Sequence, residues 1–118
     1  MILNNIEIKN YRCFEDLQLH FNKRMNVIVG NNGAGKSSIL DAISIGIGSF
    51  LLGIESSSAP GINKYDARNI TYVMGSSLEK HTQFPVTISC DGVIDKREIK
   101  WSRQLKSING STTYGDAY

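Results

Sequence analysis

The sequence has little of several features that would each mark a particular class of protein. Its 118 residues include only two cysteines, Cys13 and Cys90, which lie far apart without histidines at metal-ligand spacing, so neither a disulfide scaffold nor a zinc site is indicated. No apolar run is long enough to span a bilayer, and the first residues show no signal-peptide pattern. The net charge of +2 does not by itself indicate a nucleic-acid or membrane partner. We therefore expect one cytoplasmic domain with two reduced thiols and no membrane partner.

Two regions alternate apolar with polar residues, as half-buried β-strands do. In the first, residues 6–9 and 16–21 form two such stretches close together, which predicts an antiparallel hairpin. In the second, residues 86–90 alternate and are followed by Asp91-Gly92, a pair that favours a two-residue hairpin turn. The returning strand is expected to cover residues 93–101.

A strand of a different kind is expected before a glycine-rich segment. Residues 27–29 are Val-Ile-Val, a continuous apolar run typical of strands buried on both faces. The run ends at Gly30, and a helix is expected to begin near Lys36. Its apolar face is expected to carry Ile39, Leu40, Ile43 and Ile47. Gly46 and Gly48 either let this helix pack closely on the sheet or mark its fraying end.

The segment from Gly30 to Ser37 satisfies the phosphate-loop pattern G-x-x-x-x-G-K-[ST] and predicts binding of ATP with Mg²⁺. Backbone N–H groups in such a loop point at phosphate oxygens, and glycine permits the dihedral angles and the close approach. The positive end of the helix dipole faces the same anion. Lys36 is expected to reach the β- and γ-phosphates, Ser37 to coordinate Mg²⁺, and Ser38 to help bind the α-phosphate. The nucleotide-binding residues expected from this segment are Asn31, Asn32, Gly33, Ala34, Gly35, Lys36, Ser37 and Ser38.

Two other interpretations of the glycine-rich segment are less well supported. One is a glycine-rich turn with an incidental lysine, but the expected strand before the loop and helix after it match what phosphate binding requires. The other is a small GTPase or kinase. Such a protein would carry a guanine-specifying N-K-x-D segment or a lid with arginines, and the sequence shows neither.

Two segments carry a family resemblance. Residues 6–14 read Ile-Glu-Ile-Lys-Asn-Tyr-Arg-Cys-Phe, and residues 27–43 run from Val-Ile-Val through the glycine-rich loop to Leu-Asp-Ala-Ile. Together they resemble the N-terminus of ABC-type ATPases of the SMC/RecF class, which reads strand, N-[FY]-R-x-[FL], strand, G-x-N-G-x-G-K-[ST]-x-[IL]-[LI]-[DE]-A-[IL]. Within the class, the sequence is similar to predicted ATP-binding proteins of Septu-type and retron-associated antiviral systems.

The resemblance implies an α/β fold, lobe I of an ABC-type P-loop ATPase, with a mixed sheet, the Walker A helix and an antiparallel β layer. It implies a head-to-tail dimer that encloses two ATP molecules and acts on DNA or on a partner nuclease, such as one of the HNH type. Asn32 would order the loop or touch the γ-phosphate, and Arg12 would lie near the nucleotide. The alternative for Arg12 is an exposed turn residue. Tyr11 and Phe14 are expected to pack under the loop.

The sequence departs from the class in lacking the residues for hydrolysis. The class has a Walker B aspartate followed by a catalytic glutamate, and a signature loop donated by the partner subunit. After Ser37 no apolar run ends in Asp-Glu, and Gln83 precedes a strand instead of occupying the magnesium position. We therefore assign no catalytic residue. Residues 1–118 are expected to be the N-terminal ATP-binding lobe of a longer ATPase, truncated and inactive alone.

Two weaker signals have a functional and a structural interpretation. Residues 96–106 carry the basic side chains Lys96, Arg97, Lys100, Arg103 and Lys106, which could contact a DNA backbone. We favour a solvated edge strand, because strand alternation would divide these charges between two faces. Asp66 and Arg68 could serve the nucleotide or a dimer partner, or form a local ion pair.

The sequence as a whole predicts the ATP-binding lobe of an SMC/RecF-like ATPase. We expect it to dimerise on ATP and to act in antiviral defence with a nuclease partner. The alternatives are a DNA repair or recombination ATPase of the same class, and a nucleotide-binding fragment that does not hydrolyse.

Overall fold

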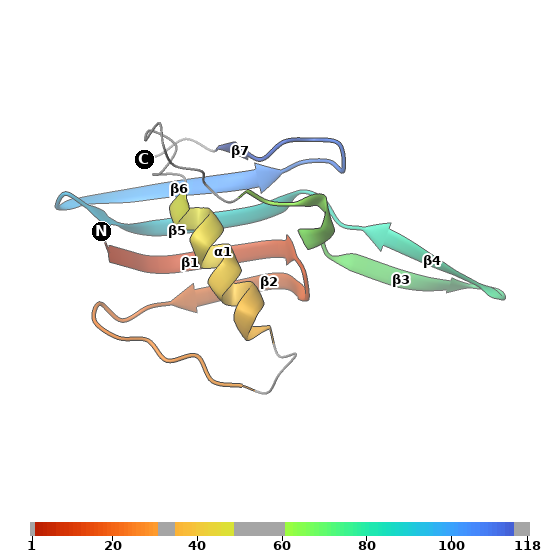
Figure 1. The fold of residues 1–118 in the computed structure, drawn as a ribbon, viewed down its shortest axis with the longest axis horizontal. Helices are drawn as coiled ribbons and strands as arrows, with labels where there is room; N and C mark the ends of the chain where they lie inside the picture. The colour runs from red at the N-terminus through yellow and green to blue at the C-terminus, as the bar shows by residue number, and fades with distance from the viewer. Residues whose placement is uncertain (1, 31–34, 49–60, 115–118) are drawn as a thin grey trace.

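The computed structural model describes residues 2–30, 35–48 and 61–114. In chain order the elements are β1 (Ile2–Tyr11), β2 (Phe14–His20), α1 (Lys36–Gly48), the 3₁₀ helix η2 (Lys64–Asp66), β3 (Asn69–Met74), β4 (Ser77–Thr82), β5 (Val86–Ile94), β6 (Arg97–Leu105) and β7 (Thr113–Tyr114). Five strands form a sheet in the order β2-β1-β5-β6-β7, and α1 crosses one of its faces (Figure 1). The predicted α/β chain with an antiparallel layer beside the helix is confirmed. All strand pairs among the described residues are antiparallel, so the mixed sheet that was expected is not seen there.

The first hairpin forms as the alternating pattern predicts. β1 pairs with β2, and Ile6 and Ile8 of β1 are buried on the face that carries α1. Glu7 and Lys9 alternate with them, and their side chains form an ion pair of 2.9 Å. β1 ends at Tyr11 and β2 begins at Phe14, so a two-residue turn joins them. This turn brings the chain back close to the start of α1.

The second hairpin has its turn later than the sequence predicts. β5 continues to Ile94, and the turn is Asp95-Lys96, whose φ angles are +49° and +65°. Positive φ at both central residues is the combination found in type I′ turns, which match the twist of the flanking strands. The returning strand is therefore β6 and not residues 93–101. The prediction of a turn at Asp91-Gly92 is wrong, since both residues lie inside β5 and pair with β6.

Glycine is needed at position 92 of β5 because the neighbouring strand lies close, and not because the chain turns there. A Cβ at Gly92 would lie 2.2 Å from the carbonyl oxygen of Ile2 in the neighbouring strand. The register of β1 against β5 shifts between Leu3 and Asn5, which marks a bulge at the same place. A glycine inside a strand often marks such a close backbone approach. Asp91-Gly92 therefore lies opposite a β-bulge and does not form a turn.

Helix α1 packs on the sheet through a different face from the one predicted. Its buried residues are Ala42, Ile45, Gly46 and Gly48, whereas Leu40 is 55% exposed. A Cβ at Gly46 would lie 2.7 Å from Sγ of Cys90 in β5, so the helix lies too close to the sheet for a larger residue. The small residues Ala42, Gly46 and Gly48 therefore let the helix approach the sheet closely, with Ile45 buried among them and Ile43 partly buried against the core. The expectation that Gly46 permits close packing is confirmed.

The apolar run before the glycine-rich loop does not form the predicted strand. Residues 25–30 have no strand assignment, and no described strand pairs with them. Met25, Val27 and Val29 are 73%, 73% and 87% exposed. The prediction of a strand buried on both faces is wrong for the described residues, because such a strand needs neighbours and covering layers that those residues do not supply.

A second sheet of two strands extends beyond the end of the main sheet (Figure 1). β3 and β4 pair antiparallel around a turn that contains Gly75, whose φ is +64°. This hairpin was not predicted from the sequence. Its side chains are largely exposed, including Val73 and Leu78, which pair across it.

Both cysteines are free thiols, as expected, but their surroundings differ. Cys13 is exposed, and Cys90 is buried under α1. Burial, with a smaller contribution from the charge of Asp91, raises the pKa of Cys90 to about 12. Among the described residues no group of three or more histidine, cysteine, aspartate or glutamate side chains could hold a metal ion. In the same ranges no helix has the length and apolarity needed to cross a membrane.

Candidate phosphate-binding site

The C-terminal end of the glycine-rich loop, Gly35, leads directly into α1. The predicted binding residues Asn31, Asn32, Gly33 and Ala34 lie outside the described residues. Gly35 is described and has a φ of +91°, a conformation that L side chains rarely adopt. Its carbonyl oxygen accepts the first helical hydrogen bond, 3.0 Å from the amide nitrogen of Ile39. The helix therefore begins at Lys36, as predicted.

The turn between β1 and β2 packs against this loop end. A Cβ at Gly35 would lie 2.6 Å from the ring of Phe14 and 3.1 Å from Sγ of Cys13. Glycine at position 35 is therefore required twice, by the backbone angle and by the space beside Phe14. The expectation that Phe14 packs under the loop agrees with this contact. Tyr11 is fully buried nearby.

The first residues of α1 present polar groups at the helix start. The ammonium group of Lys36 donates a hydrogen bond to the carbonyl oxygen of Gly30, across the loop. Ser37 is exposed, and Ser38 is half-buried. No acidic residue lies in the first turn, so the positive end of the helix dipole has no carboxylate within its own turn. This helix start therefore combines the positive end of the dipole with the ammonium group of Lys36.

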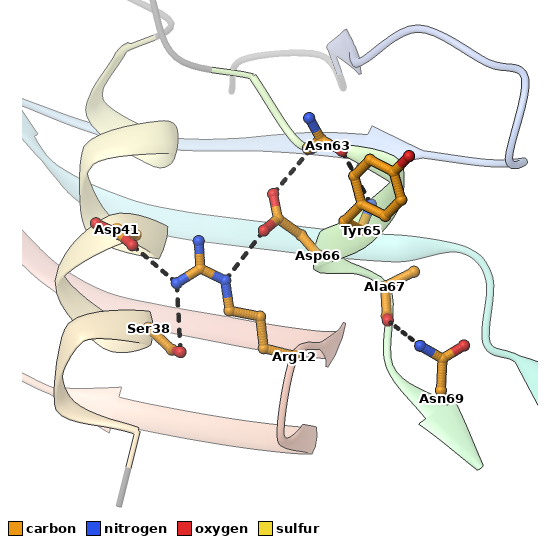
Figure 2. Close-up of polar contacts among 8 residues, drawn as sticks. All are labelled: Arg12, Ser38, Asp41, Asn63, Tyr65, Asp66, Ala67 and Asn69. Atoms are coloured by element: carbon orange, nitrogen blue, oxygen red, sulfur yellow. Dashed lines mark hydrogen bonds and ion pairs between the residues drawn. The ribbon is translucent and has the colours of Figure 1, made fainter. Parts of the chain in front are cut away.

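Arg12 joins the turn to the helix start. Its Nε donates to Asp66 Oδ1 at 3.0 Å, and its Nη1 donates to Asp41 Oδ2 at 2.8 Å and to Ser38 Oγ at 3.4 Å. Figure 2 shows the guanidinium between α1 on one side and η2 on the other. The Arg12 side chain also lies over the Tyr11 ring, 4.9 Å from its centroid. Arg12 thus lies beside the helix start and is paired with two carboxylates, whereas its expected place near a nucleotide stays a prediction.

The backbone of Arg12 is held in place as well as its side chain. Its φ is +52°, a left-handed conformation uncommon for residues other than glycine. Its amide nitrogen donates to the carbonyl oxygen of Asp66, 2.5 Å away. Burial opposes the charge on Arg12, but the hydrogen bonds to Asp41 and Asp66 outweigh it, so the pKa of Arg12 is raised. The guanidinium remains charged.

The other end of α1 is held by β6. Trp101 Nε1 donates to the carbonyl oxygen of Gly46, and Arg103 Nη1 donates to that of Ile45, both at 2.9 Å. These carbonyls belong to the last turn, whose acceptors have no partner within the helix, and a cation there complements the dipole. Arg103 is 2% exposed, so the interpretation of residues 96–106 as a solvated edge strand is wrong at this position. With both ends held, α1 is fixed on the sheet.

A hollow of about 650 Å³ lies on the sheet face opposite α1, since most of its lining residues alternate along the strands with those that face the helix. Polar side chains from four strands line it, among them Asn5, His20, Asp91 and Lys100. Asn5 Nδ2 donates to both carboxylate oxygens of Asp91, at 2.9 and 3.1 Å, and Asn5 Oδ1 lies 2.5 Å from His20 Nδ1. These groups satisfy one another, so the hollow carries no comparable argument for phosphate.

The sequence did not predict that Asp66 and Asp41 pair with Arg12. Asp66 was expected to bind nucleotide, a partner or Arg68, but its carboxylate pairs with Arg12. Asp41 was noted only as part of the family motif. It lies three residues after Ser38, which places both on the same side of α1 and within reach of one arginine. This three-residue spacing is the sequence feature from which the contact of Asp41 with Arg12 could have been predicted.

Comparison with known proteins decides the family. A protein-family model described as an AAA domain matches residues 5–117. The chain belongs to this family.

Relatives of this AAA domain chain come from the class that its N-terminal motifs predicted. It is 48% identical over 46 residues to Structural maintenance of chromosomes protein 6 of Saccharomyces cerevisiae, covering 39% of the chain and 4% of that protein. It is 49% identical over 47 residues to the DNA double-strand break repair Rad50 ATPase of Sulfolobus acidocaldarius, covering 40% and 5%. Over 68 residues it is 43% identical to the Retron Ec83 probable ATPase of Escherichia coli, covering 54% and 12%.

The resemblance to SMC/RecF-like ATPases and to a retron ATPase is therefore confirmed. The chain spans between 4% and 12% of the length of these three relatives.

Proposed function

We propose that this chain is the ATP-binding lobe of an SMC/RecF-like ATPase and that the segment from Gly30 to Ser38 holds the triphosphate. The observation that carries the proposal is the junction at Gly35. There a left-handed glycine, with no room for a Cβ, opens a helix start that carries Lys36 and no acidic residue in its first turn. Such a junction places backbone N–H groups and one ammonium group around a polyanion.

The residues present fit Mg-ATP. Main-chain amides between residues 31 and 37 would bind the phosphate oxygens, and Lys36 would exchange the Gly30 carbonyl for the β- and γ-phosphates. The Ser37 hydroxyl, exposed at the helix start, would coordinate Mg²⁺. Ser38 would bind the α-phosphate. When bound, the nucleotide supplies the phosphoanhydride bond whose hydrolysis drives ATPases of this class.

Arg12 belongs to the same site in this proposal. Its Nη1 lies 3.4 Å from Ser38 Oγ, so the guanidinium is next to the position assigned to the α-phosphate. Arginine binds phosphate through a planar fork of donors and stays charged at all relevant pH values. Arg12 is therefore a phosphate ligand from outside the loop.

The lobe is completed by further elements in the whole ATPase. The exposure of Val27 and Val29 supports this, because a Val-Ile-Val run is suited to a sheet interior. The short share of each relative that the chain covers is consistent with it. Head-to-tail dimerisation on ATP, and hydrolysis with residues supplied outside residues 1–118, belong to the same proposal.

The biological role that we propose is antiviral defence in the cytoplasm with a nuclease partner. The similarity to a retron ATPase favours it, and the similarity to a double-strand break repair ATPase favours DNA repair as the second candidate. A gene for an HNH nuclease or a reverse transcriptase beside the coding gene would support defence. Neighbouring recombination genes would support repair.

Calorimetry with Mg-ATP tests the binding proposal. Lys36→Ala should lose measurable affinity while keeping the circular dichroism spectrum of the parent protein. The matched control is Lys100→Ala, which removes an exposed lysine from β6. It should bind as the parent does. Equal affinity of Lys36→Ala and the parent would refute the proposal.

A further inference from the structure

The two carboxylates that pair with Arg12, those of Asp66 and Asp41, differ in how far they are buried. The Asp66 side chain is 13% exposed and the Asp41 side chain is 56% exposed. Both contact the same guanidinium, which is itself 32% exposed. The difference decides which contact a competing anion can replace.

Asp66 is built into its position. Its Oδ2 accepts from the amide nitrogen of Asn63 at 2.9 Å, and its own amide nitrogen donates to the Asn63 carbonyl oxygen, also at 2.9 Å, as part of the cap of η2. Its carbonyl oxygen accepts from the Arg12 amide. The segment is tied again where Arg68 donates its amide to the Asn10 carbonyl. Loss of Asp66 as a partner would leave a partly buried arginine without this charged acceptor and would break the cap of η2, which is costly.

The Asp41 side chain makes fewer contacts than that of Asp66. Among the contacts of the described residues its side chain has one partner, Arg12 Nη1, and it lies on an exposed side of α1. Exposed ion pairs stabilise proteins by little and are easily exchanged. The same Nη1 lies beside Ser38, as Figure 2 shows, so an anion at the helix start would meet the atom that Asp41 now holds.

We propose that Asp66 is a positioning residue that aims Arg12 at the phosphates, and that Asp41 competes with phosphate for Arg12 and so restrains nucleotide binding. The inference rests on the proposed function of the Gly30–Ser38 segment. A triphosphate carries more charge than a carboxylate and offers the guanidinium several oxygens. It therefore replaces Asp41 as the partner of Nη1, while Asp66 stays hydrogen-bonded to Nε. The affinity of the site is thereby lower than it would be without Asp41.

Two substitutions of equal charge change should have opposite effects. Asp41→Asn should tighten binding of Mg-ATP about two- to fivefold, since it removes a competitor with the strength of an exposed ion pair. Asp66→Asn should weaken binding about tenfold, since it removes a charged hydrogen bond that orients Arg12. Binding is measured by calorimetry with Mg-ATP and, separately, with magnesium tripolyphosphate. Because the contact is to phosphate, both probes should respond alike.

The control for charge alone is Asp95→Asn, an exposed turn residue at positive φ that asparagine also tolerates. It should leave both dissociation constants unchanged. In an Arg12→Ala background neither Asp41→Asn nor Asp66→Asn should alter binding, whereas a purely structural effect of Asp66 would persist there. Thermal denaturation identifies any variant that fails to fold. Asp41 is exposed, so its arm of the test does not depend on the outcome for Asp66.

The inference and the function on which it rests fail separately. If Lys36→Ala binds Mg-ATP normally, the phosphate site itself is wrong. If Lys36→Ala loses binding but Asp41→Asn weakens it or leaves it unchanged, the competition is refuted and the site stands. A tightening by Asp41→Asn that persists without Arg12 also overturns the inference, because Asp41 would then act on the phosphates directly.

Discussion

Gly35 and Phe14 lie so close together that a Cβ on the glycine would be 2.6 Å from the nearest carbon of the ring. The contact joins the end of the glycine-rich loop to the start of β2. It makes the geometry of the helix start depend on the turn that also carries Arg12. A substitution at either position should therefore disturb both.

Gly35→Ala should destabilise the fold by about 2–4 kcal/mol, since it adds overpacking against Phe14 to the left-handed backbone penalty. Gly75→Ala is the matched control. Gly75 also has positive φ, at +64°, but no atom lies within 4 Å of a Cβ there. It should cost only about 1–2 kcal/mol, the backbone part of the penalty. Urea denaturation measures both, and equal losses would show that the Phe14 contact is not limiting.

The contacts at the C-terminal end of α1 predict a second stability effect. Trp101→Phe keeps the aromatic ring but removes the donor to the Gly46 carbonyl, and should cost about 1–2 kcal/mol. Arg103→Met should cost more, about 2–4 kcal/mol, because it removes a buried charged donor from the Ile45 carbonyl. Lys100→Met on the exposed face of β6 should change little. Thermal or urea unfolding of the three variants would contradict this if Lys100→Met were as damaging as Arg103→Met.

The buried thiol of Cys90 predicts a pH dependence of stability with a definite sign. The pKa of Cys90 rises from 9.0 to about 12 on folding, so between these values the unfolded chain loses the proton and the folded chain keeps it. Stability is therefore fully present below pH 9 and falls as the pH rises toward 12. Cys90→Ala should flatten this alkaline decline. The decline should not vanish, because burial also raises the pKa of Tyr11 to about 12.

A thiol reagent near neutral pH tests the difference in exposure between Cys13 and Cys90. Cys13 is exposed and should react with a disulfide reagent at once, whereas Cys90 should react only as fast as the protein opens. Cys13→Ser should abolish the fast phase and leave the slow one. A fast phase that survives in Cys13→Ser would contradict the burial of Cys90.

Local patterns in the sequence were sufficient where local physics decides the structure. The first hairpin, the helix start at Lys36 and the need for glycine at position 35 all follow from alternation, helix periodicity and backbone dihedrals. Asp91-Gly92 misled because the glycine is required by the Ile2 carbonyl in another strand, which no local pattern reports. Type I′ geometry falls instead on Asp95-Lys96, a pair without glycine.

Long-range contacts set the rest of the site and the rest of the fold. The helix face could not be predicted because the approach of Gly46 to Cys90 joins residues far apart in the chain. Arg103 looked like one of several surface charges, and only the position of α1 makes it a buried cap. The pairing of Arg12 with Asp66 likewise spans 54 positions in the sequence.

The most direct test of the account is an amide chemical-shift titration with Mg-ATP. The central claim is that main-chain N–H groups from Gly30 to Ser38 hold the triphosphate. The account predicts that the largest shifts fall on these amides, with smaller ones at Arg12, and that magnesium tripolyphosphate reproduces them. Shifts concentrated instead on Asn5, His20, Asp91 and Lys100, around the hollow on the opposite face, would contradict it.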